Sequence, residues 1–126
     1  MTQQLSPFCQ QMLELADTLG HASARRMFGS VGLFMNGLMF GLVSPDDGLY
    51  IKTDDQTRET FLAAGCLPFT YTSRNKGEVA LSYYRLPDVE DEDAVRDWMR
   101  LGLQAAQRQG RKSEEPSDDP WRSLIR

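Results

Sequence analysis

Two apolar segments that meet at Asn36-Gly37 constrain the fold more than any other part of the chain. Asn-Gly between apolar runs is the strongest short-range signal of a β-hairpin, because a two-residue type I′ turn needs positive φ at both central residues. The pattern predicts one strand over 26–35 and another over 38–44. Glycines within these strands indicate bulges or close approach of the backbone. The sequence therefore predicts an antiparallel pair of strands near the start of the fold.

Apolar residues at helical spacing predict three helices. The first, over 6–20, begins with Ser6 as N-cap and Pro7 at the first helical position. The second covers 53–65, and the third covers 91–107. The third helix has an apolar stripe on which we expect Trp98 to be a core anchor, together with Val95, Leu101 and Ala105.

Further strands are expected at 49–52, 69–72 and 79–86. The order is then helix, three strands, helix, two strands, helix. Strands grouped in blocks with helices between them favour an α+β fold, with a mainly antiparallel sheet of about five strands and helices on one face. Tyr83 and Tyr84 must point to opposite faces, so at most one of them is buried beneath the helices.

The charge distribution argues against strong direct binding of DNA. The 126-residue chain has a formal net charge of −4, and six acidic side chains fall within residues 88–97. Between Ser23 and Leu86 the sequence has seven basic and six acidic side chains. Because neutralisation of phosphates supplies most of the affinity for DNA, this near-balance is unlike the basic footprint of a DNA-binding protein.

The residue types needed for catalysis, cofactor binding or metal binding do not form a recognisable motif. His21 is the single histidine, and Cys9 and Cys66 lie far apart without paired spacing. We therefore predict no catalytic, cofactor or metal site, and a reduced cytoplasmic protein. Since the sequence contains neither an apolar run of about 20 residues nor a signal-peptide pattern, no membrane segment is expected.

Two groups of residues are candidates for interaction with a partner. The first, the predicted patch, is an outward-facing basic and aromatic set formed by Arg26, Arg74, Lys76, Tyr84 and Arg85. The alternative for these residues is ordinary solvated charge around a sheet.

The second group lies in residues 111–126, which we interpret as a flexible polar tail after a folded domain over 1–110. Its apolar triplet, Trp121, Leu124 and Ile125, has i, i+3, i+4 spacing. The triplet is either part of an unstructured end or a short helical motif that docks on a partner or on a second copy of the domain.

Several motifs together resemble the N-terminal domain of the TfoX (Sxy) family of bacterial competence regulators. They are Arg-Arg-Met-Phe-Gly-Ser-Val-Gly-Leu-Phe at 25–34, Gly-Leu-Met-Phe-Gly-Leu-Val at 37–43, Leu-Tyr-Ile-Lys at 49–52, and shorter runs at 57–58, 61–65, 68–71 and 81–87. The resemblance implies an α+β fold similar to that of type III secretion chaperones. It also implies regulation of competence genes together with the cyclic-AMP receptor protein. Full-length members carry a second helical domain, which we do not expect in the residues after Gly110.

Our leading hypothesis is a non-enzymatic interaction module that modulates transcription through protein contacts. The partner would be the transcription machinery or the cyclic-AMP receptor protein. One alternative is a small-molecule-binding domain, or an enzyme of unrecognised type, that uses a cleft between sheet and helices. Another is a homodimeric chaperone-like module.

Overall fold

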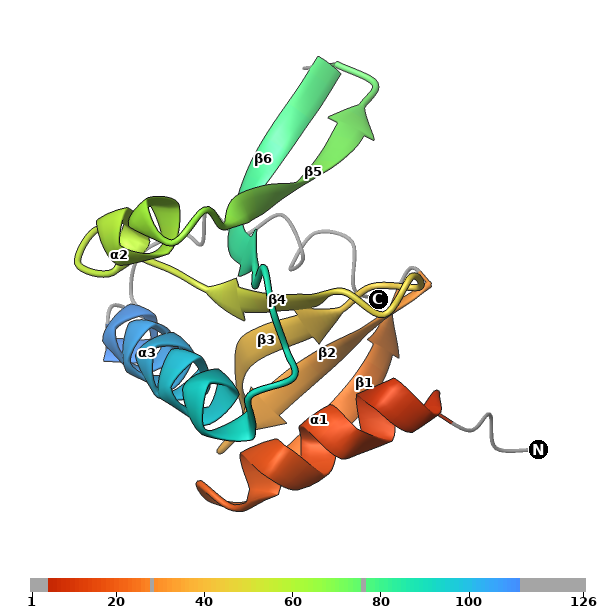
Figure 1. The fold of residues 1–126 in the computed structure, drawn as a ribbon. Helices are drawn as coiled ribbons and strands as arrows, with labels where there is room; N and C mark the ends of the chain where they lie inside the picture. Colours follow the sequence, from red (N-terminus) through yellow and green to blue (C-terminus); the bar gives the residue numbers. More distant parts are fainter. Residues whose placement is uncertain (1–4, 28, 76, 112–126) are drawn as a thin grey trace.

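The computed structural model describes residues 5–27, 29–75 and 77–111 of the chain. Figure 1 shows the arrangement of its helices and strands. In chain order they are α1 (Pro7–Asp17), β1 (Ala22–Met27), β2 (Ser30–Met35), β3 (Leu38–Val43), β4 (Leu49–Lys52), α2 (Arg58–Ala63), β5 (Leu67–Ser73), β6 (Gly77–Arg85) and α3 (Glu92–Arg111).

The described strands form one antiparallel sheet in the order β1-β2-β3-β4-β6-β5. The predicted α+β class is confirmed, although the described sheet has six strands where about five were expected. The additional strand arises because the segment predicted as one strand over 26–35 folds back on itself. Met27 is paired with Ser30, and Gly29 adopts a φ of +80° in the reversal between them. Such a φ is accessible to glycine without steric cost, which makes a tight turn feasible inside an otherwise strand-like sequence.

The hairpin predicted at Asn36-Gly37 is confirmed. Asn36 has a φ of 54° and Gly37 a φ of 79°, so both central residues of the turn have the positive φ that a type I′ turn requires. The pairing of β2 with β3 shifts between Leu33 and Phe34, which leaves one extra residue on β3. The bulge that the glycine-rich sequence indicated is therefore present in this hairpin.

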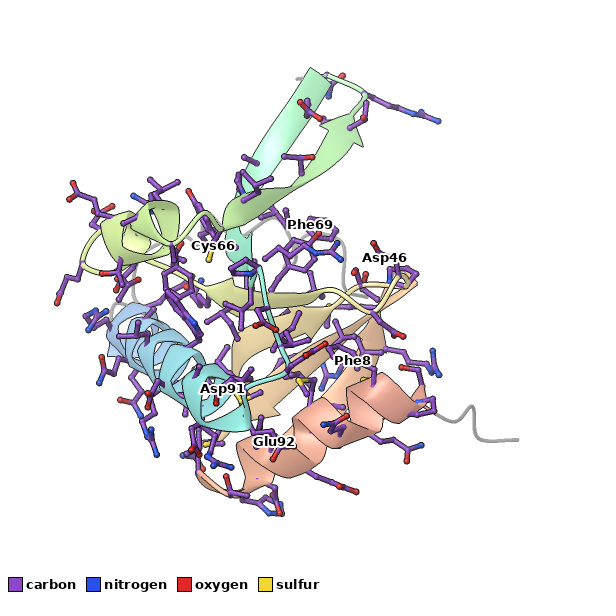
Figure 2. The ribbon with its side chains drawn as sticks, viewed as in Figure 1. Phe8, Asp46, Cys66, Phe69, Asp91 and Glu92 are labelled. Atoms are coloured by element: carbon purple, nitrogen blue, oxygen red, sulfur yellow. The ribbon has the colours of Figure 1, made fainter. Side chains whose placement is uncertain are left out.

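The β5–β6 hairpin forms the far edge of the sheet and projects away from the rest of the fold (Figure 1). Phe69 lies near the base of this hairpin, where β5 leaves the body of the domain (Figure 2). The pairing of β5 with β6 is irregular between Pro68 and Thr70. A local irregularity of this kind increases strand twist and bends the hairpin relative to the central strands.

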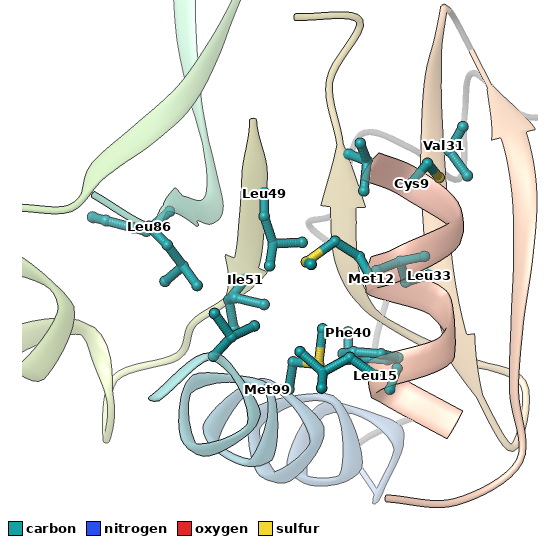
Figure 3. Close-up of a cluster of buried hydrophobic side chains, with 14 of the residues drawn as sticks. Cys9, Met12, Leu15, Val31, Leu33, Phe40, Leu49, Ile51, Leu86 and Met99 are labelled. Carbon is teal, nitrogen blue, oxygen red and sulfur yellow. The ribbon is translucent and has the colours of Figure 1, made fainter. Parts of the chain in front are cut away.

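The helices α1 and α3 pack against the same face of the sheet (Figures 1 and 3). Their buried side chains join those of the central strands in one apolar cluster, called the first cluster here. It includes Met12 and Leu15 from α1, Leu33 and Ile51 from the sheet, and Met99 from α3. The prediction of helices on one face is therefore confirmed for the described residues.

The beginning of α1 follows the predicted cap. The N–H of Cys9 donates to Ser6 Oγ at 3.1 Å, and Pro7 occupies the first helical position. The beginning of α2 differs from the prediction, because the helix begins at Arg58 rather than at 53 or 54. The Asp54 carboxylate instead accepts the N–H of Gln56 at 3.1 Å, so residues 54–57 form a turn.

Trp98 is half-buried rather than fully enclosed. Its ring centroid lies 4.6 Å from that of Phe61, so it joins α3 to α2 at the edge of the first cluster. Val95 and Met99 on the same helix are completely buried. The apolar stripe was therefore placed correctly, but Val95, Met99 and Ala105 are completely buried whereas Trp98 lies at its edge.

An ion pair joins the C-terminal part of α3 to the turn before α2. Arg108 donates from both Nε and Nη2 to the Asp54 carboxylate, and the Nη2–Oδ1 distance is 2.9 Å. Both side chains are about one-quarter exposed. The Arg108 guanidinium is the main cause that holds the pKa of Asp54 below its ordinary value.

We predict that Gly102→Ala destabilises the domain. A Cβ at this position of α3 would lie 2.6 Å from Ile51 Cγ2 and 2.9 Å from the Phe40 carbonyl oxygen, so the helix would be pushed off the sheet. Overpacking of this kind outweighs the better helix propensity of alanine, and we expect a net loss of about 1–2 kcal/mol in urea unfolding. The matched control is Gly110→Ala in the same helix, where a Cβ meets only the tip of Leu38 at 3.3 Å. Equal urea midpoints for the two variants would contradict the close packing.

We predict that Asp54→Asn lowers stability at neutral pH by about 1–2 kcal/mol, because the bond to the charged Arg108 is weakened. The pKa of Asp54 is lower in the folded protein than in the unfolded chain. Its contribution is therefore complete above about pH 5 and is lost as the pH falls through the folded pKa. Urea unfolding as a function of pH should show the wild-type and variant curves converging in acid. Asp55→Asn is the control, because the Asp55 side chain is 97% exposed, and it should show little change.

Candidate functional site

The structure does not assemble the predicted patch. Tyr84 is buried on the helix-covered face, with its ring centroid 6.2 Å from that of Phe61. Arg26 is paired with Val31, a member of the first cluster, and therefore also lies on the helix side of the sheet. Arg85 points to the opposite face because it follows Tyr84 in the strand.

The remaining members of the predicted patch do not complete it. Arg74 is exposed in the turn that joins β5 to β6, far along the projecting hairpin. Lys76 lies outside the described residues. The errors lie in Tyr84 and Arg26, which were assigned to the outer face although alternation along the strands places Tyr83 and Arg25 there. Trp121, Leu124 and Ile125 also lie outside the described residues.

The face of the sheet opposite the helices carries a different set of basic and aromatic residues. We call it the basic–aromatic face and define it by Arg25, Phe34, Tyr50, Lys52, Tyr83 and Arg85. The register brings these residues together, because Lys52 is directly opposite Tyr83 and Tyr50 is directly opposite Arg85. Side chains of directly opposed residues lie on the same side of a sheet.

Each cation of the basic–aromatic face lies over an aromatic ring. Arg25 Cζ is 5.3 Å from the centroid of Phe34, Lys52 Nζ is 5.0 Å from that of Tyr83, and Arg85 Cζ is 5.8 Å from that of Tyr50. These separations are within the range in which a cation is attracted to the negative face of a ring. The aromatic side chains therefore hold the three charges at fixed positions across the sheet.

The basic–aromatic face rests on an apolar layer of its own, called the second cluster here. Its buried members are Met27, Leu42, Leu81 and Tyr83, and all of them come from strands. Phe69 packs against this layer, and its ring meets Tyr50 edge-on at a centroid distance of 5.1 Å. The sheet thus has apolar clusters on both faces.

Lys52 is unusually buried for a lysine, with a relative exposure of 5%. Its Nζ lies 3.5 Å from Ser82 Oγ, and its ammonium is over the Tyr83 ring. The Tyr83 hydroxyl in turn donates to the Met39 carbonyl at 3.4 Å. Lys52 is therefore held in place from several directions at the end of β4.

Arg85 is held at the other end of β4. Its Nη1 donates to Asp46 Oδ2 at 3.1 Å, and Asp46 lies in the turn between β3 and β4 (Figure 2). The Tyr50 side chain and then the Asp46 carboxylate raise the pKa of Arg85. The pKa of Asp46 is lowered, first by the Ser44 hydroxyl and then by Arg85. The guanidinium thus remains fixed between a ring and a carboxylate, with part of its surface open to a partner.

The two cysteines lie outside this face and lack the setting of nucleophiles. Both are buried, and burial raises the pKa of each thiol. A nucleophilic cysteine needs a lowered pKa and an accessible sulfur. Within the described ranges, no group of three or more His, Cys, Asp or Glu side chains could hold a metal ion. None of the described helices is long and apolar enough to cross a membrane.

The family model of the TfoX N-terminal domain matches residues 14–106, well over half of the chain. The chain belongs to the TfoX N-terminal domain family. No curated protein matches the chain significantly. The match begins within α1 and ends within α3, so it includes all the strands that form the basic–aromatic face.

Arg85 is the one member of the basic–aromatic face of this TfoX-type domain that sequence reasoning included. Alternation offered a signal for three of the members that it missed. Tyr83 is two positions before Arg85 in one strand, and Tyr50 is two positions before Lys52 in another, which places each pair on one face. That spacing was readable from the sequence. Which face the helices cover was not, because both faces of these strands carry large apolar or aromatic side chains.

We predict that Cys9 and Cys66 do not react with an aromatic disulfide reagent in the native protein at neutral pH. Their burial keeps the thiols protonated and shielded, so the reagent should label them only after unfolding in urea. Release of the coloured thiolate product measures the labelling. Rapid reaction of either cysteine in the native protein would contradict this prediction and would make that cysteine a candidate nucleophile.

Proposed function

We propose that this chain is a non-enzymatic, cytoplasmic interaction module that modulates transcription through protein contacts. Membership in the TfoX N-terminal domain family supports a regulatory role. The partners we propose are the transcription machinery or the cyclic-AMP receptor protein, as the family resemblance implies. The basic–aromatic face is the surface that we assign to the contact.

The chemistry of the basic–aromatic face supports a protein partner rather than a nucleic acid. Its three cations lie over rings, and Arg85 also has a carboxylate partner. Aromatic residues and arginine are enriched at the energetic centres of protein interfaces. The net charge of −4 opposes binding of a polyanion by the chain as a whole. An acidic segment of a protein with apolar side chains fits this surface best.

Binding should be tested with the purified chain, the purified cyclic-AMP receptor protein and RNA polymerase. Fluorescence anisotropy of the labelled chain would report association, with and without a promoter fragment. We predict binding to one of these proteins that Arg25→Glu weakens at least several-fold, because a negative charge on the basic–aromatic face repels an acidic partner. The matched control is Arg74→Glu, which makes the same change at the exposed turn of the β5–β6 hairpin.

The chain alone should bind duplex DNA more weakly than about 10⁻⁴ M at physiological salt. Sequence-specific binding of the isolated chain at nanomolar concentration would overturn the protein-contact proposal. If neither Arg25→Glu nor Arg74→Glu changes the affinity for the protein partner, the contact lies outside the basic–aromatic face.

A further inference from the structure

The second cluster is buried deeply, although α1 and α3 pack on the other side of the sheet. Leu42 has a relative exposure of 0%, Leu81 of 6% and Met27 of 7%. An α+β domain normally buries an apolar sheet face against another layer. A segment that packs on this face would meet aromatic rings and cations, so the segment that fits it best carries apolar side chains and negative charge.

The end of α3 delivers the chain to the edge of this face. Gly110 lies beside Leu38 at the beginning of β3, and Arg108 is bonded to Asp54 just after β4. Because β3 and β4 are antiparallel, the beginning of β3 and the end of β4 lie at the same end of the sheet. Met39 and Lys52, which belong to the side of the second cluster, are at that end.

Residues 112–126 have the composition that this face requires. Residues 113–120 contain four acidic side chains and no basic one, and the apolar residues Trp121, Leu124 and Ile125 follow. The three basic residues of the segment, Lys112, Arg122 and Arg126, lie outside the acidic stretch. A stretch of fifteen residues reaches about 50 Å when extended. Six strands spaced about 4.8 Å apart span only about 24 Å, so the segment is long enough to cross the sheet.

We propose that residues 112–126 dock in cis on the basic–aromatic face of the same molecule. The acidic stretch lies near Arg25, Lys52 or Arg85, and the Trp121, Leu124 and Ile125 side chains extend the second cluster. The docking of this segment does not depend on the proposed function of the chain. If that function also holds, a protein partner must displace the segment, which makes the segment a built-in competitor.

The test uses the complete chain with Trp98→Phe, which leaves Trp121 as the sole tryptophan. Acrylamide quenching of Trp121 is compared with that of a free peptide of residues 112–126. We expect quenching to be several-fold weaker in the protein and unchanged on dilution over two orders of magnitude, with light scattering showing a monomer. If the protection of Trp121 from acrylamide disappears on dilution and light scattering shows a dimer, the segment docks on a second copy of the chain. That result would overturn docking in cis. Quenching equal to that of the free peptide would also overturn the proposal.

Charge variants identify the face on which the segment docks. Arg25→Glu combined with Arg85→Glu should return the quenching of Trp121 to that of the free peptide, whereas Arg74→Glu should leave it unchanged. If circular dichroism shows that the double variant does not fold, the same test can be made by removing the negative charges of the segment instead. Replacing the four acids of the segment with Gln or Asn (Glu114→Gln, Glu115→Gln, Asp118→Asn, Asp119→Asn) should release Trp121 as well. Continued protection in the variant without these acids would overturn the charge-directed docking.

Discussion

The central strands must keep apolar side chains away from water on both sides of one sheet. Leu33 and Ile51 point toward the helices, whereas Leu42 points to the opposite face, and all three are completely buried. The helices α1 and α3 satisfy this requirement on one side, where Gly102 allows α3 to approach the backbone of β3 closely. On the other side aromatic rings and the cations above them take the place of a helix layer. The unusual chemistry of the basic–aromatic face therefore follows from a sheet that is apolar on both faces.

Local signals predicted most of the elements, because their causes are local. The type I′ turn depends on the φ preferences of Asn36 and Gly37, and the first helix depends on the hydroxyl of Ser6. The acids before α3 also act locally, since Asp91 Oδ1 accepts the N–H of Asp93 at 3.1 Å. The reversal at Gly29 was missed because a two-strand turn and a bulged single strand share the same glycine-rich, apolar sequence.

The candidate site depended on a property that the sequence does not contain. Alternation predicts that Tyr83 and Tyr84 lie on opposite faces, but choosing the inner one requires knowledge of which face the helices cover. Tyr84 contacts Phe61 of α2, so Tyr84 faces the helices. Tyr83 and Arg85 therefore both face the opposite side of the sheet. The same reasoning separates Arg25 from Arg26. The assignment of faces thus changed the composition of the proposed surface, although β4 and β6 were placed nearly correctly.

The two sides of the domain also differ in charge, and this difference decides how a partner would approach. The acidic residues 88–97 lie at the start of α3, where Glu92 accepts from Gln11 of α1, so they belong to the helix layer. Arg25 and Arg85 are exposed on the opposite face, where Lys52 is buried and Asp46 pairs with Arg85. A protein with net charge −4 can therefore still present a positive surface in one direction. Complementary potentials of this kind steer encounter and orientation more than they add affinity. An acidic segment would thus be repelled from the helices and guided to the basic–aromatic face, where the aromatic rings supply the apolar contact that holds it.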